Sequence, residues 1–337
     1  MQARFNASGG LDPIFRTVDG SNSPNADVST LDQRRAAYSM LTSRGVIRVG
    51  RPIPANAEFE LVAVNDPYGF ASAAELSLFR RPLASSNLRF SSTVMWDSRE
   101  TQPDFRLALS NQANNATLGH AQALAPLTQA VRTSIVDFET ALFTAQLVDS
   151  QVGRLDAAGA RGGPQALSTQ ATVAGAFDLF NAWATVAGND PVNSGRRAIA
   201  RGQALFNNPN AGVGGLACGT CHNVANVGTH SASVLFDIGV SAGVRRTPDM
   251  PLYTLRHKAT GETRETTDPG QALTTGRWVD VDHFKTPNLR GLSARAPYFH
   301  NGSARTLGDV VEFYKAVFGF AFSPSETADL VAFLRSL

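Results

Sequence analysis

The segment Cys218-Gly219-Thr220-Cys221-His222 contains both cysteines of this 337-residue chain. In the spacing Cys-x-x-Cys-His, the two thiols can form thioether bonds to the vinyl groups of a haem, and the adjacent histidine can bind its iron. The motif therefore predicts a covalently attached haem c on Cys218 and Cys221, with His222 as the proximal iron ligand. Two alternatives stay open: a thioredoxin-type redox pair uses the cysteines alone, and a zinc site needs a fourth ligand, for which His230 is the candidate.

The residues on either side of this motif predict a helical domain over 195–337. An amphipathic helix is expected over 196–206, with Ser194 as its N-cap. Near the end of the chain, Ser323-Pro324-Ser325-Glu326 combines an N-cap, a proline at the first helical position and a glutamate at the third. The apolar stripe that follows predicts a terminal helix that packs against the first one. A helix, a loop and then the Cys-x-x-Cys-His motif resemble the start of a cytochrome c domain.

The first half of the chain has a weaker pattern. Turn signals interrupt the apolar runs of residues 1–105, which indicates loops with few helices. A helix is expected from a cap at Ser134 to about Leu147, and a second, mostly buried one over 171–187, with a linker at 157–164 between them.

These patterns predict a mainly α protein with two domains, a loop-rich and partly helical one over 1–190 and the haem domain over 195–337. The length agrees with about two domains. The 30 basic and 28 acidic residues leave a net charge of +2 and form no run of like charges, so nucleic acid is not an expected partner. No stretch reaches the roughly 18 uninterrupted apolar residues of a membrane helix, and the first ten residues lack the apolar core of a secretory signal.

Two segments downstream of the haem motif resemble the bacterial di-haem cytochrome c peroxidase and MauG family. They are FKTPNLRG at 284–291 and APYFHNGS at 296–303, followed by Thr306-Leu307. The resemblance covers 195–337 and implies two c-type haems, an N-terminal one where peroxide reacts and a C-terminal one that relays electrons. It assigns Cys218, Cys221 and His222 to the C-terminal haem, whereas the first Cys-x-x-Cys-His of the family is absent here.

The resemblance also implies a sixth iron ligand fourteen residues after His300, which is Tyr314. Family members have methionine or tyrosine at this place. The helical spacing of the neighbouring apolar residues would equally suit a core tyrosine, and Met250, the methionine downstream of the haem motif, is the rival ligand. A phenolate ligand would favour ferric iron and lower the reduction potential relative to a thioether.

In the first half, the segment 96–99 (WDSR) resembles the family's W-D-G-R motif, whose tryptophan relays electrons between the haems; a plain core aromatic is the alternative for Trp96. Gln112 matches a glutamine of the peroxide pocket, and Gln122 stands ten residues later, where relatives have an acid. Because an amide cannot exchange a proton as a carboxylate does, His120 and Glu139 become candidates for proton transfer. Both also have a structural explanation: His120 can be a histidine that faces solvent, and Glu139 can belong to a structural helix.

The implied reaction is reduction of peroxide, or oxidation of an unknown substrate, with a small redox protein as electron donor or acceptor. A mono-haem electron carrier without catalysis is the alternative. We expect residues 1–190 to be the remnant of a peroxidase-type domain in a longer di-haem protein, and a natural mono-haem form is the other possibility. Covalent haem attachment in bacteria follows export, which predicts the periplasm. The family further implies a possible homodimer and calcium on the backbone carbonyls of Arg295 and Pro297.

Overall fold

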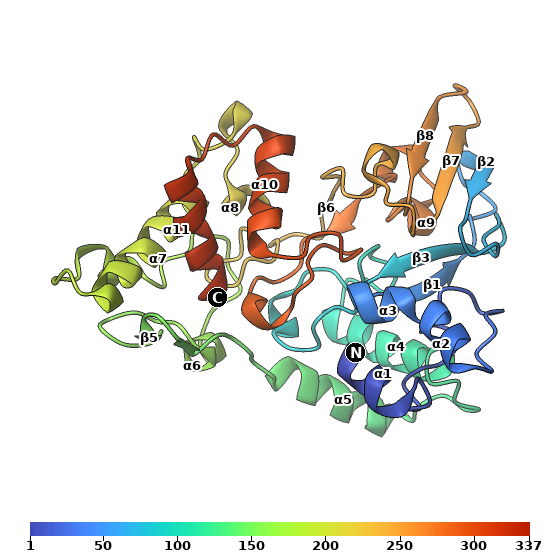
Figure 1. The fold of residues 1–337 in the computed structure, drawn as a ribbon, viewed down its shortest axis with the longest axis horizontal. Helices are drawn as coiled ribbons and strands as arrows, with labels where there is room; N and C mark the ends of the chain where they lie inside the picture. Colours follow the sequence, from blue (N-terminus) through green and yellow to red (C-terminus); the bar gives the residue numbers. More distant parts are fainter.

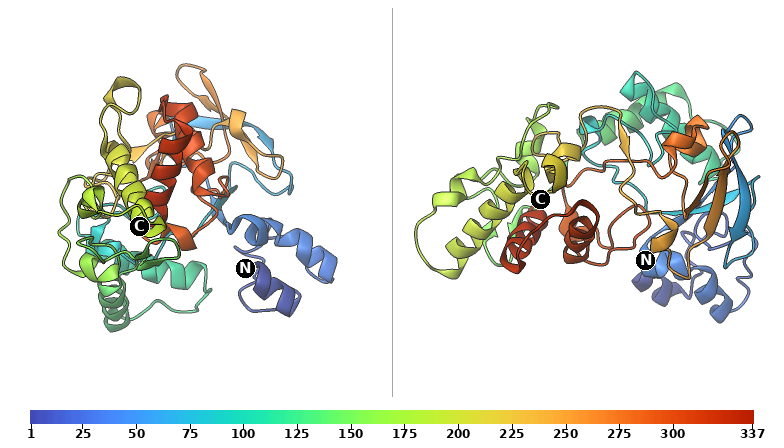
Figure 2. Two further views of the ribbon diagram at one scale, coloured as in Figure 1. Left: turned by 60° about the vertical axis from the view of Figure 1, so that its left-hand side comes forward. Right: turned by 90° about the horizontal axis from the view of Figure 1, so that it is seen from above.

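The computed structural model describes residues 1–337 and combines helices with small antiparallel sheets (Figure 1). Helices hold 36% of the residues and strands 13%, so the expectation of a mainly α protein was wrong. Helices α7, α10 and α11 gather at one end of the molecule, and strands β1–β3, β7 and β8 lie at the other (Figures 1 and 2).

Among the remaining helices, α4 and α5 are long and the others have seven residues or fewer. The helices and strands of the whole chain are α1 (Gln2–Ser8), α2 (Leu31–Ala37), α3 (Ser39–Arg44), β1 (Ile47–Arg51), β2 (Phe59–Asn65), β3 (Leu76–Arg80), α4 (Phe105–Gly119), α5 (Gln129–Ala141), β4 (Val148–Asp149), β5 (Gly153–Arg154), α6 (Pro164–Ser168), α7 (Pro191–Asn207), α8 (Cys218–Cys221), β6 (Leu235–Phe236), β7 (Leu252–His257), β8 (Thr263–Thr266), α9 (Ala272–Thr275), β9 (Phe284–Lys285), α10 (Leu307–Phe318) and α11 (Pro324–Arg335). No helix among them has the length and apolarity to cross a lipid bilayer.

The sheets account for the error in fold class. Strand β2 pairs with β7, which also pairs with β8, so residues from both halves of the chain form one three-stranded antiparallel sheet. Phe59 from β2 and Tyr253 and Leu255 from β7 are buried in the core beneath this sheet, together with Leu76 and Leu78 of β3. Because strand pairing depends on partners almost two hundred residues apart, local sequence patterns gave little sign of it.

The helical end contains the terminal helix that the sequence predicts. Ser323 caps α11 and forms a capping box with Glu326, and α11 packs along α7. The two helices touch at Gly202, where a Cβ atom would lie 2.0 Å from the backbone oxygen of Asp329. Only glycine therefore fits where the two helices cross, because any side chain would collide with the backbone of α11.

Two other helices differ from the sequence-based expectation. Helix α5 begins after Thr128, which caps it, rather than after Ser134. The helix expected over 171–187 is not formed: only a 3₁₀ turn at Asn181–Thr185 is helical. Instead, the side chains of Asn207 and Gln203 on α7 accept hydrogen bonds from the backbone N–H groups of Phe177 and Phe180, which a helix would have bonded internally.

The core of the helical end draws on residues from both sides of the expected boundary at 190–195. Phe180 and Trp183 are buried against Phe333 of α11 and Phe206 of α7, in a cluster that begins at Val152. In the same way, residues 252–281 lie with the N-terminal strands. The chain therefore passes between the two ends of the molecule several times.

A buried ion cluster joins β3 to two distant loops. Arg80 donates to Asp97 at 2.6 Å and to both carboxylate oxygens of Asp268 at 2.6 and 2.8 Å, and Arg99 donates to Asp97 at 2.9 Å. Burial alone would raise the pKa of Asp97, but the Arg80 and Arg99 guanidinium groups outweigh it and hold this pKa well below its usual range. The cluster fixes the residue next to Asp97 in the chain, Trp96.

The contact at Gly202 gives a test of the helical end. Gly202→Ala should lower the free energy of unfolding by about 1–3 kcal/mol, because the added methyl group forces α7 away from α11. The measurement is urea unfolding followed by far-UV circular dichroism, with Gly119→Ala as the control, since a Cβ there meets nothing within 4 Å. Equal stability of the two variants would contradict the tight crossing.

Candidate functional site

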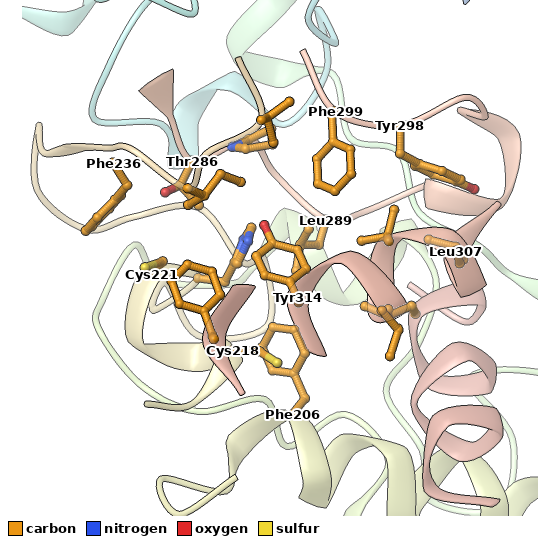
Figure 3. A pocket seen from close by; sticks show the side chains of 18 of the residues that line it. Phe206, Cys218, Cys221, Phe236, Thr286, Leu289, Tyr298, Phe299, Leu307 and Tyr314 are labelled. Atoms are coloured by element: carbon orange, nitrogen blue, oxygen red, sulfur yellow. The ribbon is translucent and has the colours of Figure 1, made fainter. Parts of the chain in front are cut away.

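The Cys-x-x-Cys-His motif lines a largely apolar cavity at the helical end. The cavity measures about 1380 Å³, is partly open to solvent, and has 23 hydrophobic residues among its 28 lining residues. Cys218 and Cys221 form the short helix α8 on one side, and α10 supplies the opposite side (Figure 3). Such a lining suits the flat hydrophobic ring of a porphyrin, and free thiols at its wall suit covalent attachment.

The two thiols lack the environment of a reactive redox pair. Burial raises the pKa of Cys218 to about 12 and also raises the pKa of Cys221. Thioredoxin-type chemistry needs a thiolate near neutral pH, which an apolar surrounding disfavours. The arrangement therefore fits thioether formation better than thiol–disulfide exchange.

His222 is oriented by one backbone contact. Its Nδ1–H donates to the carbonyl oxygen of Gly228 at 2.6 Å, which leaves Nε2 as the nitrogen with a free lone pair. Burial lowers the pKa of His222 to about 4, so the ring is neutral near pH 7. A neutral imidazole held through its other nitrogen is the usual form of a histidine that binds a metal.

His230, the candidate fourth zinc ligand, does not complete such a site. It packs edge-on against Phe236, its Nδ1 contacts the backbone of Ala232, and it does not line the cavity that contains Cys218 and Cys221. No cluster of three or more histidine, cysteine or acidic side chains stands close enough together to hold a metal ion. The thiols and the imidazole are thus spread around a cavity rather than gathered about one point.

Tyr314 projects from α10 into the same cavity (Figure 3). Its ring stacks on Phe318 at 5.8 Å and faces Phe299 at 6.1 Å. Burial raises its pKa, and the nearby sulfur atoms of Cys218 and Cys221 raise it further. The rival ligand Met250 lies in a separate core cluster with Phe79 and lines neither of the two large cavities.

A second cavity of about 1490 Å³ lies between the two ends of the molecule. Three of the four expected pocket residues, Gln112, His120 and Glu139, line it together. Gln122 does not: the chain turns after α4, and the exposed Gln122 side chain accepts a hydrogen bond from Arg16 instead. Both cysteines belong to the first cavity, so these 337 residues offer the second cavity no thioether attachment.

Glu139 is the acid of the second cavity that has no partner. One of its carboxylate oxygens is buried without a hydrogen bond, and burial raises its pKa. His120, by contrast, lies with its Nδ1 2.9 Å from a carboxylate oxygen of Asp19 and has 42% of its side chain exposed. Of the two candidates for proton transfer, Glu139 is the one whose carboxylate has no hydrogen bond within the protein, whereas His120 is bonded at Nδ1 and has only Nε2 free.

Trp96 lines both cavities. Its indole Nε1–H donates to the carbonyl oxygen of Arg81 at 2.7 Å, and its own carbonyl oxygen accepts from the N–H of Lys285 at 2.9 Å. The ring also stands edge-on to His300 at 6.1 Å, and His300 in turn stacks on Phe284 at 4.0 Å. These contacts hold the indole in the wall between the two cavities.

Lys285 is a further residue of this wall, to which the sequence alone assigned no role. It is buried, lines both cavities and donates from Nζ to the carbonyl oxygen of Thr93 at 2.7 Å. Burial lowers its pKa to about 8. A signal was present, because this is one of only three lysines in the chain and it follows Phe284 in the segment 284–291 that resembles the family.

The carbonyl groups expected to bind calcium lie at the edge of the second cavity. Arg295 and Pro297 both line it. The carbonyl oxygen of Arg295 accepts a hydrogen bond from Nη2 of Arg81 at 2.9 Å, so a side-chain cation of the protein already contacts it.

No protein-family model matches the sequence, but several curated proteins resemble it. The cytochrome-c peroxidase IdrP2 of Denitromonas iodatirespirans is 34% identical over 137 residues, which cover 37% of this chain and 36% of the relative. The IdrP1 protein of the same organism is 31% identical and is covered over 39% of its length. The matched segments thus span less than two fifths of these peroxidases.

A match over almost the whole chain comes from the methylamine utilization protein MauG of Methylophilus methylotrophus. It is 27% identical over 338 residues, which cover 96% of this chain and 87% of that protein. Among solved structures, a MauG-like protein associated with microbial copper homeostasis covers 78% of this chain and 74% of its own, with 16% identity and a TM-score of 0.45. The sequence is therefore similar to bacterial cytochrome-c peroxidases and to MauG, in agreement with the resemblance that its motifs indicate.

Proposed function

We propose that this protein is a c-type haem oxidoreductase that couples electron transfer at the first cavity to peroxide reduction, or to substrate oxidation, at the second. The observation that carries the proposal is that the two cavities share a wall of six residues, among them Trp96. The first cavity has the thiols and the imidazole of a haem c site, and the second has an amide and an unpartnered acid. In family terms, residues 195–337 would be the haem domain and residues 1–190 the remnant of the peroxidase-type domain.

In the first cavity, Cys218 and Cys221 would hold the haem and His222 would bind its iron through Nε2. Haem iron supplies reversible one-electron chemistry when it is bound there. Tyr314 is the proposed sixth ligand. Because burial raises the pKa of Tyr314, its phenol stays protonated unless a positive charge faces the oxygen, so ligation by the phenolate should be a property of the oxidised protein.

In the second cavity, Glu139 would accept a proton from peroxide and return it to the leaving oxygen. The Gln112 amide would donate a hydrogen bond that orients the same molecule. His120 is the second candidate for the proton: its Nδ1 contacts Asp19, its Nε2 is free, and 42% of its side chain is exposed. Trp96 would carry electrons through the wall between the two cavities.

The electron donor would be a small redox protein, and the place of action the periplasm, because covalent haem attachment follows export in bacteria. Peroxide and an unidentified oxidisable compound are the two candidate substrates. Calcium and a homodimer are expectations of the family. A pure electron carrier is the competing function, and it requires neither Glu139 nor the second cavity.

The Tyr314 assignment is tested by the optical spectrum of the ferric protein. The wild type should lack the far-red charge-transfer band of a methionine–iron bond, and Tyr314→Met should create it and raise the midpoint potential by on the order of 0.1 V, within the ~0.8 V range that axial ligands span. Met250→Leu is the matched control and should leave the spectrum unchanged. A far-red band in the wild type that disappears in Met250→Leu would assign the ligand to Met250.

The catalytic proposal is tested by peroxide turnover with a reduced c-type cytochrome as electron donor. Glu139→Gln should lower turnover by about 10²-fold, because the amide cannot exchange the proton. Asp137→Asn removes an exposed carboxylate from the same helix and should change turnover by less than about twofold. An intact wild-type haem spectrum without any peroxide turnover would instead favour the electron carrier.

The pH dependence of peroxide turnover gives a second test of Glu139 as the base. As a base, Glu139 must be ionised, so turnover should rise with pH through a pKa above the ordinary glutamate value of 4.5, since burial raises this pKa. This step should be absent from the pH profile of Glu139→Gln. A wild-type profile that is flat between pH 4 and 7 would argue against a role for this carboxylate.

A further inference from the structure

The edge of the second cavity contains a side-chain cation bonded to two backbone carbonyl groups. Arg81 follows β3, and its guanidinium donates from Nη1 to the carbonyl oxygen of Arg44 and from Nη2 to that of Arg295, both at 2.9 Å. The first oxygen belongs to the end of α3 and the second to the loop before His300. One side chain thus ties together three segments that are far apart in the sequence.

The backbone of Arg81 extends this connection to the tryptophan. Its N–H donates to the carbonyl oxygen of His300 at 2.6 Å, and its carbonyl oxygen accepts from Nε1 of Trp96 at 2.7 Å. The hydrogen bond of the Trp96 indole is therefore made to the residue whose guanidinium bonds Arg44 and Arg295.

The guanidinium fits here because two neighbouring residues, Gly45 and Gly302, have no side chain. Gly45 has a φ of +62°, and a Cβ there would lie 2.6 Å from Nη1 of Arg81. A Cβ on Gly302 would lie 2.6 Å from the carbonyl oxygen of Arg44, which accepts from the same Nη1. Two glycines from opposite halves of the chain thus permit the close approach of backbone and guanidinium.

The charges at this place do not suit a calcium ion. Calcium takes six to eight oxygen ligands, whereas the Arg295 oxygen is turned toward the Arg81 guanidinium. The Arg295 side chain adds a second positive charge, which together with burial lowers the pKa of Arg81. The carboxylate of Asp249 pairs with the Arg44 side chain at 2.7 Å. A divalent cation would meet two guanidinium groups here and would have to displace one of them.

We propose that the Arg81 guanidinium takes the role of a divalent cation at this junction, so that the protein holds Trp96 and the loop 295–300 in place without calcium. Arg81 is thus a positioning residue for Trp96. The inference does not depend on the reaction that the protein catalyses, because it concerns only how the wall between the cavities is held.

The test compares calcium with the guanidinium in the full-length, haem-loaded protein. Wild-type protein passed through calcium-free buffer should contain less than about 0.1 calcium per chain by atomic emission. Its melting temperature and its ¹⁵N–¹H indole signals should be the same in EGTA and in 1 mM calcium chloride. A stoichiometric calcium ion, or a melting temperature that rises by several degrees with calcium, would overturn the proposal.

Arg81→Ala should lower the melting temperature by at least ~4 °C, because two carbonyl groups lose a charged donor. It should also shift the indole signal of Trp96, identified by its loss in Trp96→Phe, and Arg81→Lys should restore part of both effects. Arg197→Ala is the matched control: Arg197 also donates to two backbone carbonyls, those of Val186 and Gly188, but lines neither cavity.

If Arg81→Ala does not fold, Arg81→Lys still tests the proposal. It keeps the positive charge but lacks the planar guanidinium that donates to both carbonyl oxygens. A Trp96 signal that stays unchanged in Arg81→Lys, or that moves equally in Arg197→Ala, would show that Arg81 does not position the indole.

Discussion

The buried ion cluster around Arg80 is the constraint on which the rest of the structure depends. Both carboxylates and the guanidinium are almost completely removed from water, with side-chain exposures of 2% for Arg80, 0% for Asp97 and 1% for Asp268. Removing charges from water is costly, and a buried pair that loses one partner destabilises a protein by about 3–5 kcal/mol. The three segments that supply these charges cannot separate without that cost, and one of them contains Trp96.

The two cavities share a wall but differ chemically. On the helical side, apolar residues surround His222 and Tyr314, and burial keeps the imidazole neutral and the phenol protonated. On the other side, arginines, Gln112 and Glu139 give the second cavity a more polar lining. Trp96 and Lys285 are two of the six residues that line both cavities, and they supply an aromatic ring and a positive charge to the shared wall.

The features that could be predicted from the sequence are those specified by neighbouring residues. The capping box at Ser323 defines the start of α11 through residues three apart, and the five-residue haem motif identifies its own chemistry. The helix expected over 171–187 failed because its backbone groups bond to Gln203 and Asn207, which no local pattern reveals. The pairing of β2 with β7 was missed for the same reason, since each strand needs a partner from the other half of the chain.

In the candidate site, too, local patterns could be recognised from the sequence and contacts between distant residues could not. The candidate residues Gln112, Glu139 and Trp96 line the second cavity, whereas Gln122 lies outside it because the chain turns between α4 and α5. Lys285 had only its rarity as a lysine to mark it, and Arg81 had no local signal, because both residues act through bonds to distant carbonyl groups. Such contacts depend on the tertiary structure and carry no periodicity of their own.

The most direct measurement is the number of covalently bound haems per chain, by the pyridine haemochrome assay after acid–acetone extraction. The protein should be produced with a cytochrome c maturation system and compared with the Cys218→Ala/Cys221→Ala variant. One haem should remain on each wild-type chain after extraction, and none on the variant, if these two thiols at the first cavity form the thioether bonds. Haem-free wild-type protein, or haem that is extracted equally from both, would contradict a haem c site at this cavity.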